Sequence, residues 1–216
     1  TEVSVNTVTT LKALCKTDTG PYLRPFAPNQ DWNQAKIFIV GTNPATPLRN
    51  EFRDFDDYWF SLTSNVANFE SIYSKRHLSG ASKTTLRARK VIVALDPLPV
   101  LVTNSIAHPT SRMSKLTNLP HHREIGSQCF ELLVTLNQPK VILFHGKEAC
   151  NLCARVFGVV LDRYMPISNQ ISQSDSGIGL YGFPHFCGVG VKKGYSVAGM
   201  NEELRVFSDI AKDIIS

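Results

Sequence analysis

Polar side chains stand at the ends of four apolar segments in this sequence. They are Thr42 and Asn43 after KIFIVG, Asn104 at the end of VLVTN, His145 at the end of KVILFH, and His185 after IGLYGFP. A single Asn after a strand is usually a turn residue, because its amide bonds to nearby backbone. Four strand ends that all carry such side chains are harder to explain as turns. We therefore expect these residues to face one crevice and to form a site.

The four apolar segments are predicted to be strands. Residues 36–41 are apolar after Lys36, as in a strand that is covered on both faces. Residues 100–104 and 140–146 follow the same pattern, and residues 178–186 form a weaker fourth strand. Helical patterns separate these segments, and this alternation predicts an α/β fold. We expect a single domain in which a short central parallel sheet of about four strands lies between helical layers. Ligands bind beyond the carboxyl ends of such strands, where the polar side chains would lie.

Helices are expected where apolar residues recur at helical spacing. The expected ranges are 56–73, 123–137, 147–157 and 201–215. Residues 74–90 are basic and contain Ser and Gly, so we expect a loop there, followed by a short helix or strand over residues 90–95. Cys150 and Cys153 are expected on one buried helix face, because no second pair of ligands follows at zinc spacing.

The composition is that of an ordinary globular protein, with 216 residues, 43% of them hydrophobic and 19% charged. We expect one domain over residues 1–216, with residues 1–35 as an N-terminal extension packed on it. No apolar run approaches the roughly 20 residues of a membrane span. A net charge of +5 suits a polyanionic partner. The five cysteines are an odd number in a chain that needs no disulfides, which favours the reducing cytoplasm or nucleus.

The segment GTNP, residues 41–44, holds the side chain of Asn43 in a fixed direction, and this amide side chain is only weakly basic. Asn43 could hold a water through its carbonyl, or read a ligand edge with donor and acceptor together. Gly41 lets the backbone approach a ligand closely, and Pro44 restricts the conformation of Asn43. Such an amide suits a reaction whose leaving group departs largely by itself, as in glycosidic cleavage through an oxocarbenium-like transition state.

Several segments resemble motifs of the uracil-DNA glycosylase superfamily, in the same order along residues 36–215. VGTNPATP resembles the first motif, Gly-x-Asn-Pro or Gly-x-Asp-Pro after a strand, in the Asn form of the mismatch-specific and single-strand-selective branches. VLVTNSIAHPTSR resembles the second strand, and FPHFCGVG lies where the second catalytic motif would fall. REIGSQCFELLVTLNQPKVILFHGKEA is similar to a helix–strand–glycine segment of the iron–sulfur branch, and DYWFSL to an aromatic pair of the mismatch-specific branch.

The resemblance implies a role for each matching residue. Asn43 would hold the attacking water near the sugar carbon. His185 would donate a hydrogen bond to the base oxygen as negative charge develops there. Asn104 would bind the base edge through its amide and select uracil over cytosine. The backbone at Gly41 and Thr42 would also contact the base.

The resemblance further implies an aromatic side chain that stacks on the base, in the segment after Pro44. Phe52 is the first choice by spacing and Phe55 the second, although a core role fits either one equally well. Tyr58 and Trp59 are expected in the core.

The segment after His185 is expected to contact DNA. The expected contact residues are Cys187, Gly188, Val189, Lys192 and Lys193. Val189 would enter the DNA helix as a wedge where the base is extruded, and Lys192 and Lys193 would bind phosphates. A base inside a duplex cannot be attacked, so the enzyme must flip it out. Phosphate contacts would supply affinity that falls with salt.

The chain departs from the family pattern at several positions. HFC at residues 185–187 replaces His-Pro-Ser, and a thiol is a poorer donor than the serine that helps to hold a phosphate. AT at residues 45–46 replaces the usual Gly or Tyr after the first-motif proline. Only Cys129 matches a cysteine of the iron–sulfur branch, so we expect no cluster, no metal and no other cofactor.

These features predict a monomeric, monofunctional DNA glycosylase of base excision repair. It would flip uracil or a related damaged or mismatched base out of DNA and hydrolyse the N-glycosidic bond. Its expected partner is lesion-containing DNA, and no membrane is expected as a partner. Two alternatives remain open. One is a catalytically silent member of the same fold that binds DNA or protein. The other is a small-molecule cysteine hydrolase in which Cys187 is activated near His185.

Overall fold

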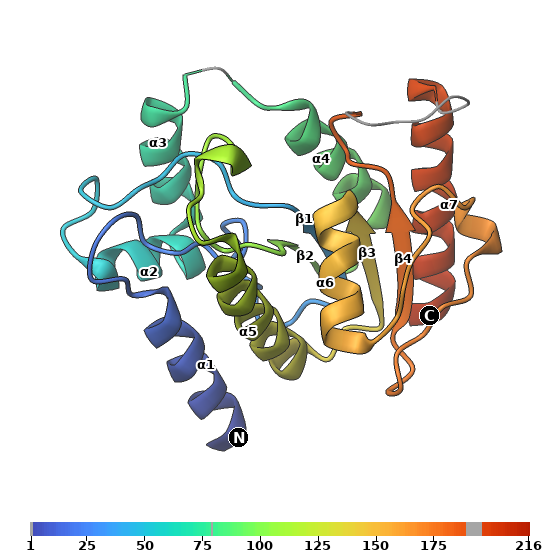
Figure 1. Ribbon diagram of the computed structural model, residues 1–216, viewed down its shortest axis with the longest axis horizontal. Coiled ribbons are helices and arrows are strands. Elements are labelled where there is room, and N and C mark those ends of the chain that lie inside the picture. Colours follow the sequence, from blue (N-terminus) through green and yellow to red (C-terminus); the bar gives the residue numbers. More distant parts are fainter. Residues whose placement is uncertain (1, 79, 189–195) are drawn as a thin grey trace. The chain divides into compact units, whose positions relative to one another are not determined.

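The computed structural model describes residues 2–78, 80–188 and 196–216 (Figure 1). The chain divides into two compact units. The first, which we call the helical unit, contains Thr1–Gln34, Asn43–Gly80 and Thr103–Gln138. The second, the sheet unit, contains Ala35–Thr42, Ala81–Val102 and Pro139–Ser216. The assignment of residues 1–216 to one domain stays a prediction.

The sheet unit is built on a four-stranded parallel sheet within the described residues. Its strands are β1 (Ile37–Gly41), β2 (Val100–Asn104), β3 (Val141–His145) and β4 (Gly179–Phe183). Their order is β2-β1-β3-β4, and β3 pairs in parallel with both β1 and β4. Every residue of β1, β3 and β4 is buried, which explains their almost entirely apolar sequences. The predicted α/β class with a short parallel sheet is confirmed.

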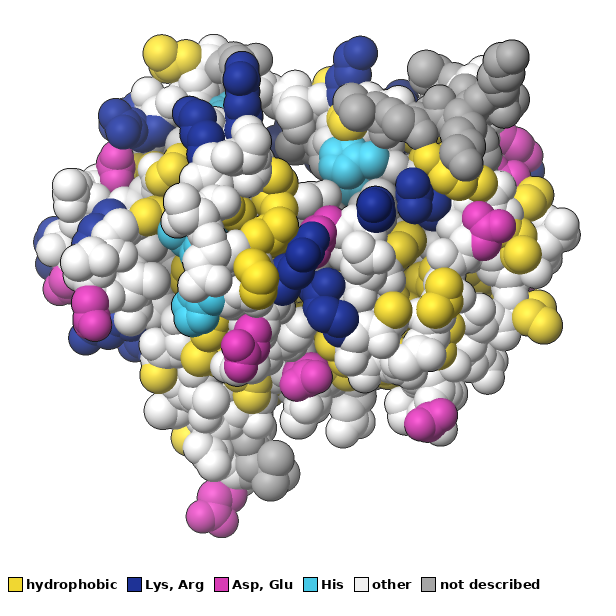
Figure 2. Space-filling view, in the orientation of Figure 1, with side chains coloured by type: hydrophobic (Ala, Val, Ile, Leu, Met, Phe, Trp, Pro, Cys, Tyr) yellow, Lys and Arg dark blue, Asp and Glu magenta, His cyan; other side chains and the backbone are white. Residues whose placement is uncertain are grey.

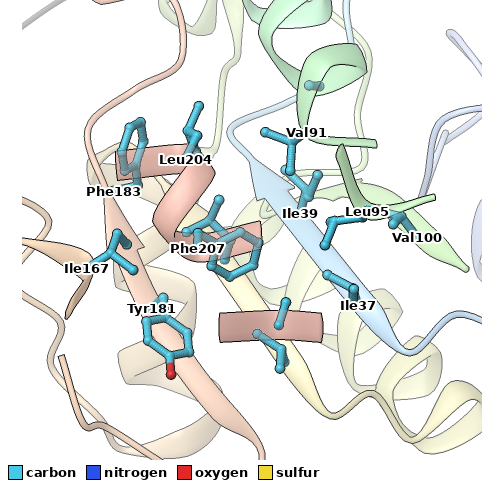
Figure 3. Close-up of a cluster of buried hydrophobic side chains, with 14 of the residues drawn as sticks. Ile37, Ile39, Val91, Leu95, Val100, Ile167, Tyr181, Phe183, Leu204 and Phe207 are labelled. Atoms are coloured by element: carbon cyan, nitrogen blue, oxygen red, sulfur yellow. The ribbon is translucent and has the colours of Figure 1, made fainter. Parts of the chain in front are cut away.

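Helices cover the sheet. They are α4 (Lys83–Leu95), α6 (Lys147–Phe157) and α7 (Val197–Ile215), with a 3-10 turn, η2 (Ile167–Asn169). Helices α4 and α7 pack against each other, and their apolar side chains join those of the sheet in one buried cluster, as Figure 3 shows for Val91, Ile39 and Phe207. Helix α6 packs against β3 and β1.

Helix α4 corrects the expected loop over residues 74–90. Ser82 caps the helix, because its Oγ accepts a hydrogen bond from the N–H of Thr85 at 3.1 Å. The helix then buries a stripe formed by Ala88, Val91 and Leu95. The Ser and Gly residues of the basic segment all precede Lys83. From Lys83 on, the segment is therefore a helix whose inner side belongs to the core.

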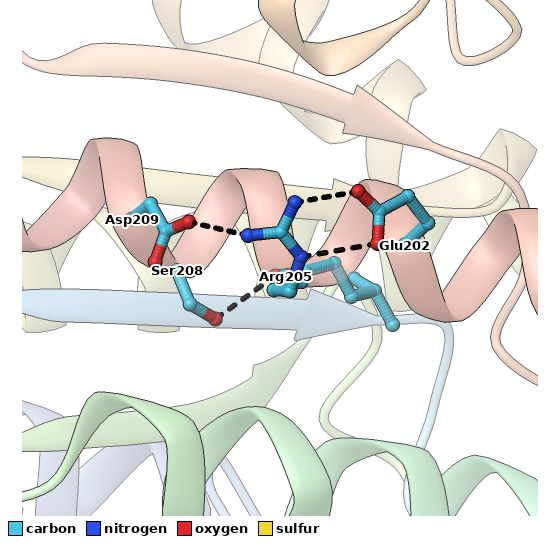
Figure 4. Close-up of polar contacts among 5 residues, drawn as sticks. Glu202, Arg205, Ser208 and Asp209 are labelled. Carbon is cyan, nitrogen blue, oxygen red and sulfur yellow. Dashed lines mark hydrogen bonds and ion pairs between the residues drawn. The ribbon is translucent and has the colours of Figure 1, made fainter.

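The outer face of α7 carries an exposed ion-pair network. Arg205 pairs with Glu202 at 2.6 Å and with Asp209 at 3.0 Å (Figure 4). Ser208, which is buried, donates a hydrogen bond to the backbone oxygen of Leu204 at 2.9 Å. Exposed pairs contribute little to stability, so the apolar face of α7 holds the helix in place.

The helical unit contains α1 (Glu2–Cys15), α2 (Phe55–Thr63), α3 (Val66–Arg76), the 3-10 turn η1 (Met113–Lys115) and α5 (Leu119–Asn137). The helix expected over residues 56–73 is two helices, because Asn65 interrupts it and caps α3 through the N–H of Asn68.

Helix α1 packs against α5. No helix within the described part of the chain is long and apolar enough to span a lipid bilayer.

Aromatic side chains form much of the core of the helical unit. They are Tyr22, Phe26, Trp32, Phe52, Phe55, Tyr58, Trp59 and Phe69. Their rings lie within contact of one another, for example Phe26 stacked on Trp32 with centroids 4.9 Å apart. The burial of Tyr58 and Trp59 confirms their predicted core role.

Candidate functional site

His185 lies in the sheet unit, two residues after β4. It is partly buried, and its Nδ1 accepts a hydrogen bond from the backbone N–H of Cys187 at 3.1 Å. A peptide N–H can only donate, so Nδ1 must present its lone pair. In the neutral ring the proton is therefore on Nε2. The turn after β4 thus prepares His185 as a hydrogen-bond donor.

The backbone of Gly146 lies directly against the His185 ring. It is the N-cap of α6, with φ at 89°, and a Cβ built there would lie 2.8 Å from His185 Cδ2. Only glycine allows both this backbone conformation and this close approach. Burial lowers the pKa of His185 below its ordinary value. The positive end of the α6 dipole acts in the same direction, since it disfavours a second proton on the ring.

His145, the last residue of β3, supports this arrangement. It is 2% exposed, it stacks on Phe186 with ring centroids 3.8 Å apart, and it meets His185 edge to face at 5.3 Å. Its Nδ1 accepts the N–H of Phe186 at 3.3 Å. Burial above all, then the charges of His185 and Arg87, hold its pKa well below the ordinary value. His145 is therefore a neutral group that positions the turn after β4.

Asn43 lies in the helical unit, and its amide orientation is set by two carbonyl groups. Its Nδ2 donates to the backbone oxygens of Pro44 and Thr110, both at 3.0 Å. The N–H of Thr110 in turn donates to the oxygen of Pro44 at 2.9 Å. Because both partners are acceptors, the amide must turn its NH₂ toward them. The Oδ1 of Asn43 is then presented as an acceptor, as holding a water requires.

Arg24 clamps the loop that follows Asn43. Arg24 is 4% exposed and donates hydrogen bonds to the backbone oxygens of Ala45 and Thr46, the latter at 2.8 Å. Thr46 has a φ of 60°, which a threonine rarely adopts. The guanidinium also lies over the rings of Phe69 and Tyr73, and burial lowers its pKa. The sequence did not indicate this residue, because Arg24 is far from the first motif along the chain.

Asn104 ends β2 and belongs to the helical unit. It is partly buried. The backbone just beyond it is tightly packed, since a Cβ on Gly126 of α5 would lie 2.0 Å from the Ser105 oxygen. Gly41 is buried and Thr42 partly buried, at the end of β1 in the sheet unit. These positions leave the predicted roles of Asn104, Gly41 and Thr42 as predictions.

Phe52 and Phe55 are packed in the aromatic core of the helical unit. Phe52 is 6% exposed and meets the rings of Tyr58 and Phe69, while Phe55 is 4% exposed and meets Tyr22 and Tyr58. Their exposed area is too small for a base to stack on either ring. The core role is the one that this packing supports, so the predicted stacking role is corrected for both.

The predicted DNA-contacting segment is described only in part. Cys187 and Gly188 are partly buried, and Gly188 has a φ of 82°. Val189, Lys192 and Lys193 lie outside the described residues. Their predicted contacts with DNA stay predictions.

The cysteines of the CxxC segment are structural. Cys150 and Cys153 are 7% and 0% exposed on α6, which confirms the predicted buried face. Burial raises the pKa of Cys150 to about 11 and that of Cys153 to about 12. Among residues 2–78, 80–188 and 196–216 no group of three His, Cys, Asp or Glu side chains is arranged to hold a metal ion.

The structure thus brings His145, His185 and Gly146 together in the sheet unit, and Asn43, Thr110 and Arg24 around one loop of the helical unit. That Asn43 and His185 face a common crevice stays a prediction. The chain matches no protein-family model and no curated protein sequence.

Proposed function

We propose that this protein is a monofunctional DNA glycosylase that hydrolyses the N-glycosidic bond of uracil or a related base after flipping it out of DNA. The observation that carries the proposal is the Cys187 N–H bonded to His185 Nδ1, which leaves Nε2–H as a donor on a ring whose pKa is lowered. A departing pyrimidine takes the bonding electrons and develops negative charge on its oxygen. A prealigned donor at that oxygen stabilises the transition state.

Asn43 supplies the second half of the chemistry in this proposal. Its Oδ1 holds a water molecule, which attacks the sugar carbon as the base leaves and then loses a proton to solvent. The leaving group is already an anion stabilised by His185, so no strong base is needed. The two carbonyl contacts of the Asn43 NH₂ support this role, because they orient the acceptor. Asn104 would read the edge of the base through its amide.

The charge distribution is compatible with a nucleic-acid partner. The net charge is +5, and Lys and Arg side chains are spread over the face drawn in Figure 2, with acidic side chains between them. Phosphate contacts of this kind give binding that weakens as salt rises.

The cysteine hydrolase alternative is disfavoured by the same hydrogen bond. A base that activates the Cys187 thiol needs a free ring lone pair. Nδ1 of His185 already accepts the N–H of Cys187, and Nε2 carries the proton. His185 therefore has no lone pair to offer the thiol.

The test is single-turnover cleavage of uracil-containing oligonucleotides, single-stranded and duplex, followed by detection of abasic sites. We expect wild-type activity, and a loss of about 10²- to 10³-fold for His185→Ala or Asn43→Ala. Lys140→Gln, an exposed position before β3, serves as the control and should cleave like the wild type. Cys187→Ala should also retain activity. A protein that binds DNA but excises neither uracil nor mismatched thymine nor hypoxanthine would instead be a silent DNA-binding protein.

A further inference from the structure

Arg87 of α4 has no ion-pair partner shown among the described residues. Its Nη1 atom is buried and has no hydrogen-bond partner within residues 2–78, 80–188 and 196–216. Arg205, by contrast, pairs with two carboxylates. A buried guanidinium N–H without an acceptor is unfavourable. The position therefore suits an acceptor that the described residues do not supply.

The geometry of α4 places Arg87 at the carboxyl end of the sheet. Val91 lies beside Ile39 and Leu95 lies nearer to Ile37, so α4 runs antiparallel to β1 (Figure 3). Arg87 is one turn before Val91, on the side of α4 that faces the sheet, and thus lies toward the end of β1. The charge of Arg87 also acts on His145, the last residue of β3.

The groups around this position form a surface suited to an anion. His145 and His185 have lowered pKa values and lie edge to face, and Arg87 is the permanent positive charge that acts on His145. Helix α6 begins at Gly146 without a side-chain cap, so its first N–H groups add positive potential, and the acidic Glu148 of this turn is paired with Arg155 at 3.6 Å. A guanidinium matches the geometry of phosphate oxygens and stays charged at any working pH.

We propose that Arg87 binds a phosphate group, and that in the substrate this is a phosphodiester next to the extruded nucleotide. The inference rests on the proposed function for the source of the phosphate, although a free phosphate would satisfy the same chemistry. Arg87 binds the backbone, and the Nε2–H of His185 is left for the base. The phosphate supplies the acceptor that Nη1 lacks.

The first experiment uses inorganic phosphate and needs no enzymatic activity. The thermal unfolding temperature is measured with phosphate and with chloride at equal ionic strength. We expect phosphate to raise it in the wild type and in Lys140→Gln, to a reduced extent in Arg87→Lys, and not at all in Arg87→Gln. If Arg87 serves only packing, Arg87→Gln shifts the baseline temperature and keeps the response to phosphate, which overturns the proposal.

The second experiment measures the affinity of a single-stranded oligonucleotide that carries an uncleavable 2′-fluoro-deoxyuridine, as a function of salt. Loss of one phosphate contact lowers the slope of log K against log salt by about 0.7 on a single strand. We expect this decrease for Arg87→Gln and no decrease for Lys140→Gln. An unchanged slope together with slower cleavage would place Arg87 against the base instead and would overturn the phosphate assignment.

The two proposals can fail separately. A phosphate response that depends on Arg87, in a protein that cleaves no oligonucleotide, supports the anion site and contradicts the glycosylase. Cleavage by the wild type, with phosphate response and salt slope both unaffected by Arg87→Gln, supports the glycosylase and contradicts the anion site.

Discussion

The backbone N–H of Cys187 donates a hydrogen bond to Nδ1 of His185 at 3.1 Å. The bond joins a ring to a peptide group two residues later, so the conformation of the turn determines which nitrogen carries the proton. The side chain of Cys187 takes no part in it. Cys187 stands where the motif that this segment resembles has a serine, and this difference leaves the proposed donor role of His185 intact.

The first prediction concerns the protonation state of His185. Burial lowers its pKa, so the ring should be neutral at pH 7 with its proton on Nε2, and it should take up a second proton only below the ordinary value near 6.5. Nitrogen-15 NMR of the imidazole measures both properties. A ring that is cationic at pH 7, or protonated on Nδ1 alone, would contradict the assigned donor role.

The second prediction concerns His145 and stability against pH. The pKa of His145 is well below its ordinary value in the folded protein, so from about pH 6.5 downward the unfolded chain binds a proton that the native state does not. Stability then falls by about 1.4 kcal/mol per pH unit for this one group. His145→Asn keeps an acceptor for the Phe186 N–H and should give a shallower fall between pH 6 and pH 5. Denaturant unfolding at pH 8 gives the packing cost of the substitution, and an unchanged acid slope would refute the prediction.

The third prediction distinguishes two effects of an alanine at position 146: backbone strain, and displacement of the His185 ring. Gly146→Ala introduces a Cβ 2.8 Å from His185 Cδ2 at a φ of 89°, so it should displace the ring and reduce cleavage at least tenfold, as well as lower stability by about 1 kcal/mol or more. Gly177→Ala is the matched control, because its φ is 81° but its Cβ would have nothing within 4 Å. It should lose similar stability and keep its activity. Equal activity losses in the two variants would show that strain alone is responsible.

The fourth prediction concerns the loop of Asn43. Arg24→Gln removes the charged donors that hold the oxygens of Ala45 and Thr46, so the free energy of unfolding should fall by about 2–3 kcal/mol and kcat should fall more than KM rises. Arg49→Gln is the control. Arg49 binds the backbone oxygens of Thr17 and Gly20 and does not bond to the Asn43 loop.

That control should lose stability and keep kcat. If Arg24→Gln keeps its kcat as well, the clamp is a stabilising element without influence on Asn43. Arg24→Lys, which retains the charge but not the two-pronged donor, should fall between the wild type and Arg24→Gln.

The fifth prediction concerns thiol reactivity. Burial raises the pKa of Cys150 to about 11 and that of Cys153 to about 12, and Cys15 and Cys129 are also buried. At pH 8 these four thiols should stay unmodified by a disulfide reagent in the native protein, while the partly buried Cys187 reacts first. In denaturant all five should react. Rapid modification of Cys150 or Cys153 in the native protein would argue against a structural role for the CxxC segment.

The sequence predicted the sheet well because strands covered on both faces are nearly continuous apolar runs. It failed where burial was decided by distant residues. The basic segment that contains Ser82 and Arg87 resembles a loop until the sheet is present to receive Ala88 and Val91. Phe52 could equally have met a base or a core, and only its contact with Tyr58 and Phe69 distinguished the two.

By itself, the sequence determined the α/β class and the polar residues that end the strands, because both follow from local alternation between apolar runs and turn-forming residues. The tertiary structure alone decided the state of those polar groups. The tautomer of His185 and the direction of the Asn43 amide depend on which backbone groups lie within about 3 Å of them. The same holds for Nη1 of Arg87, which has no partner in the described part of the chain. Hydrogen bonds of that length join groups that folding brings together, and composition or spacing along the chain carries no record of them.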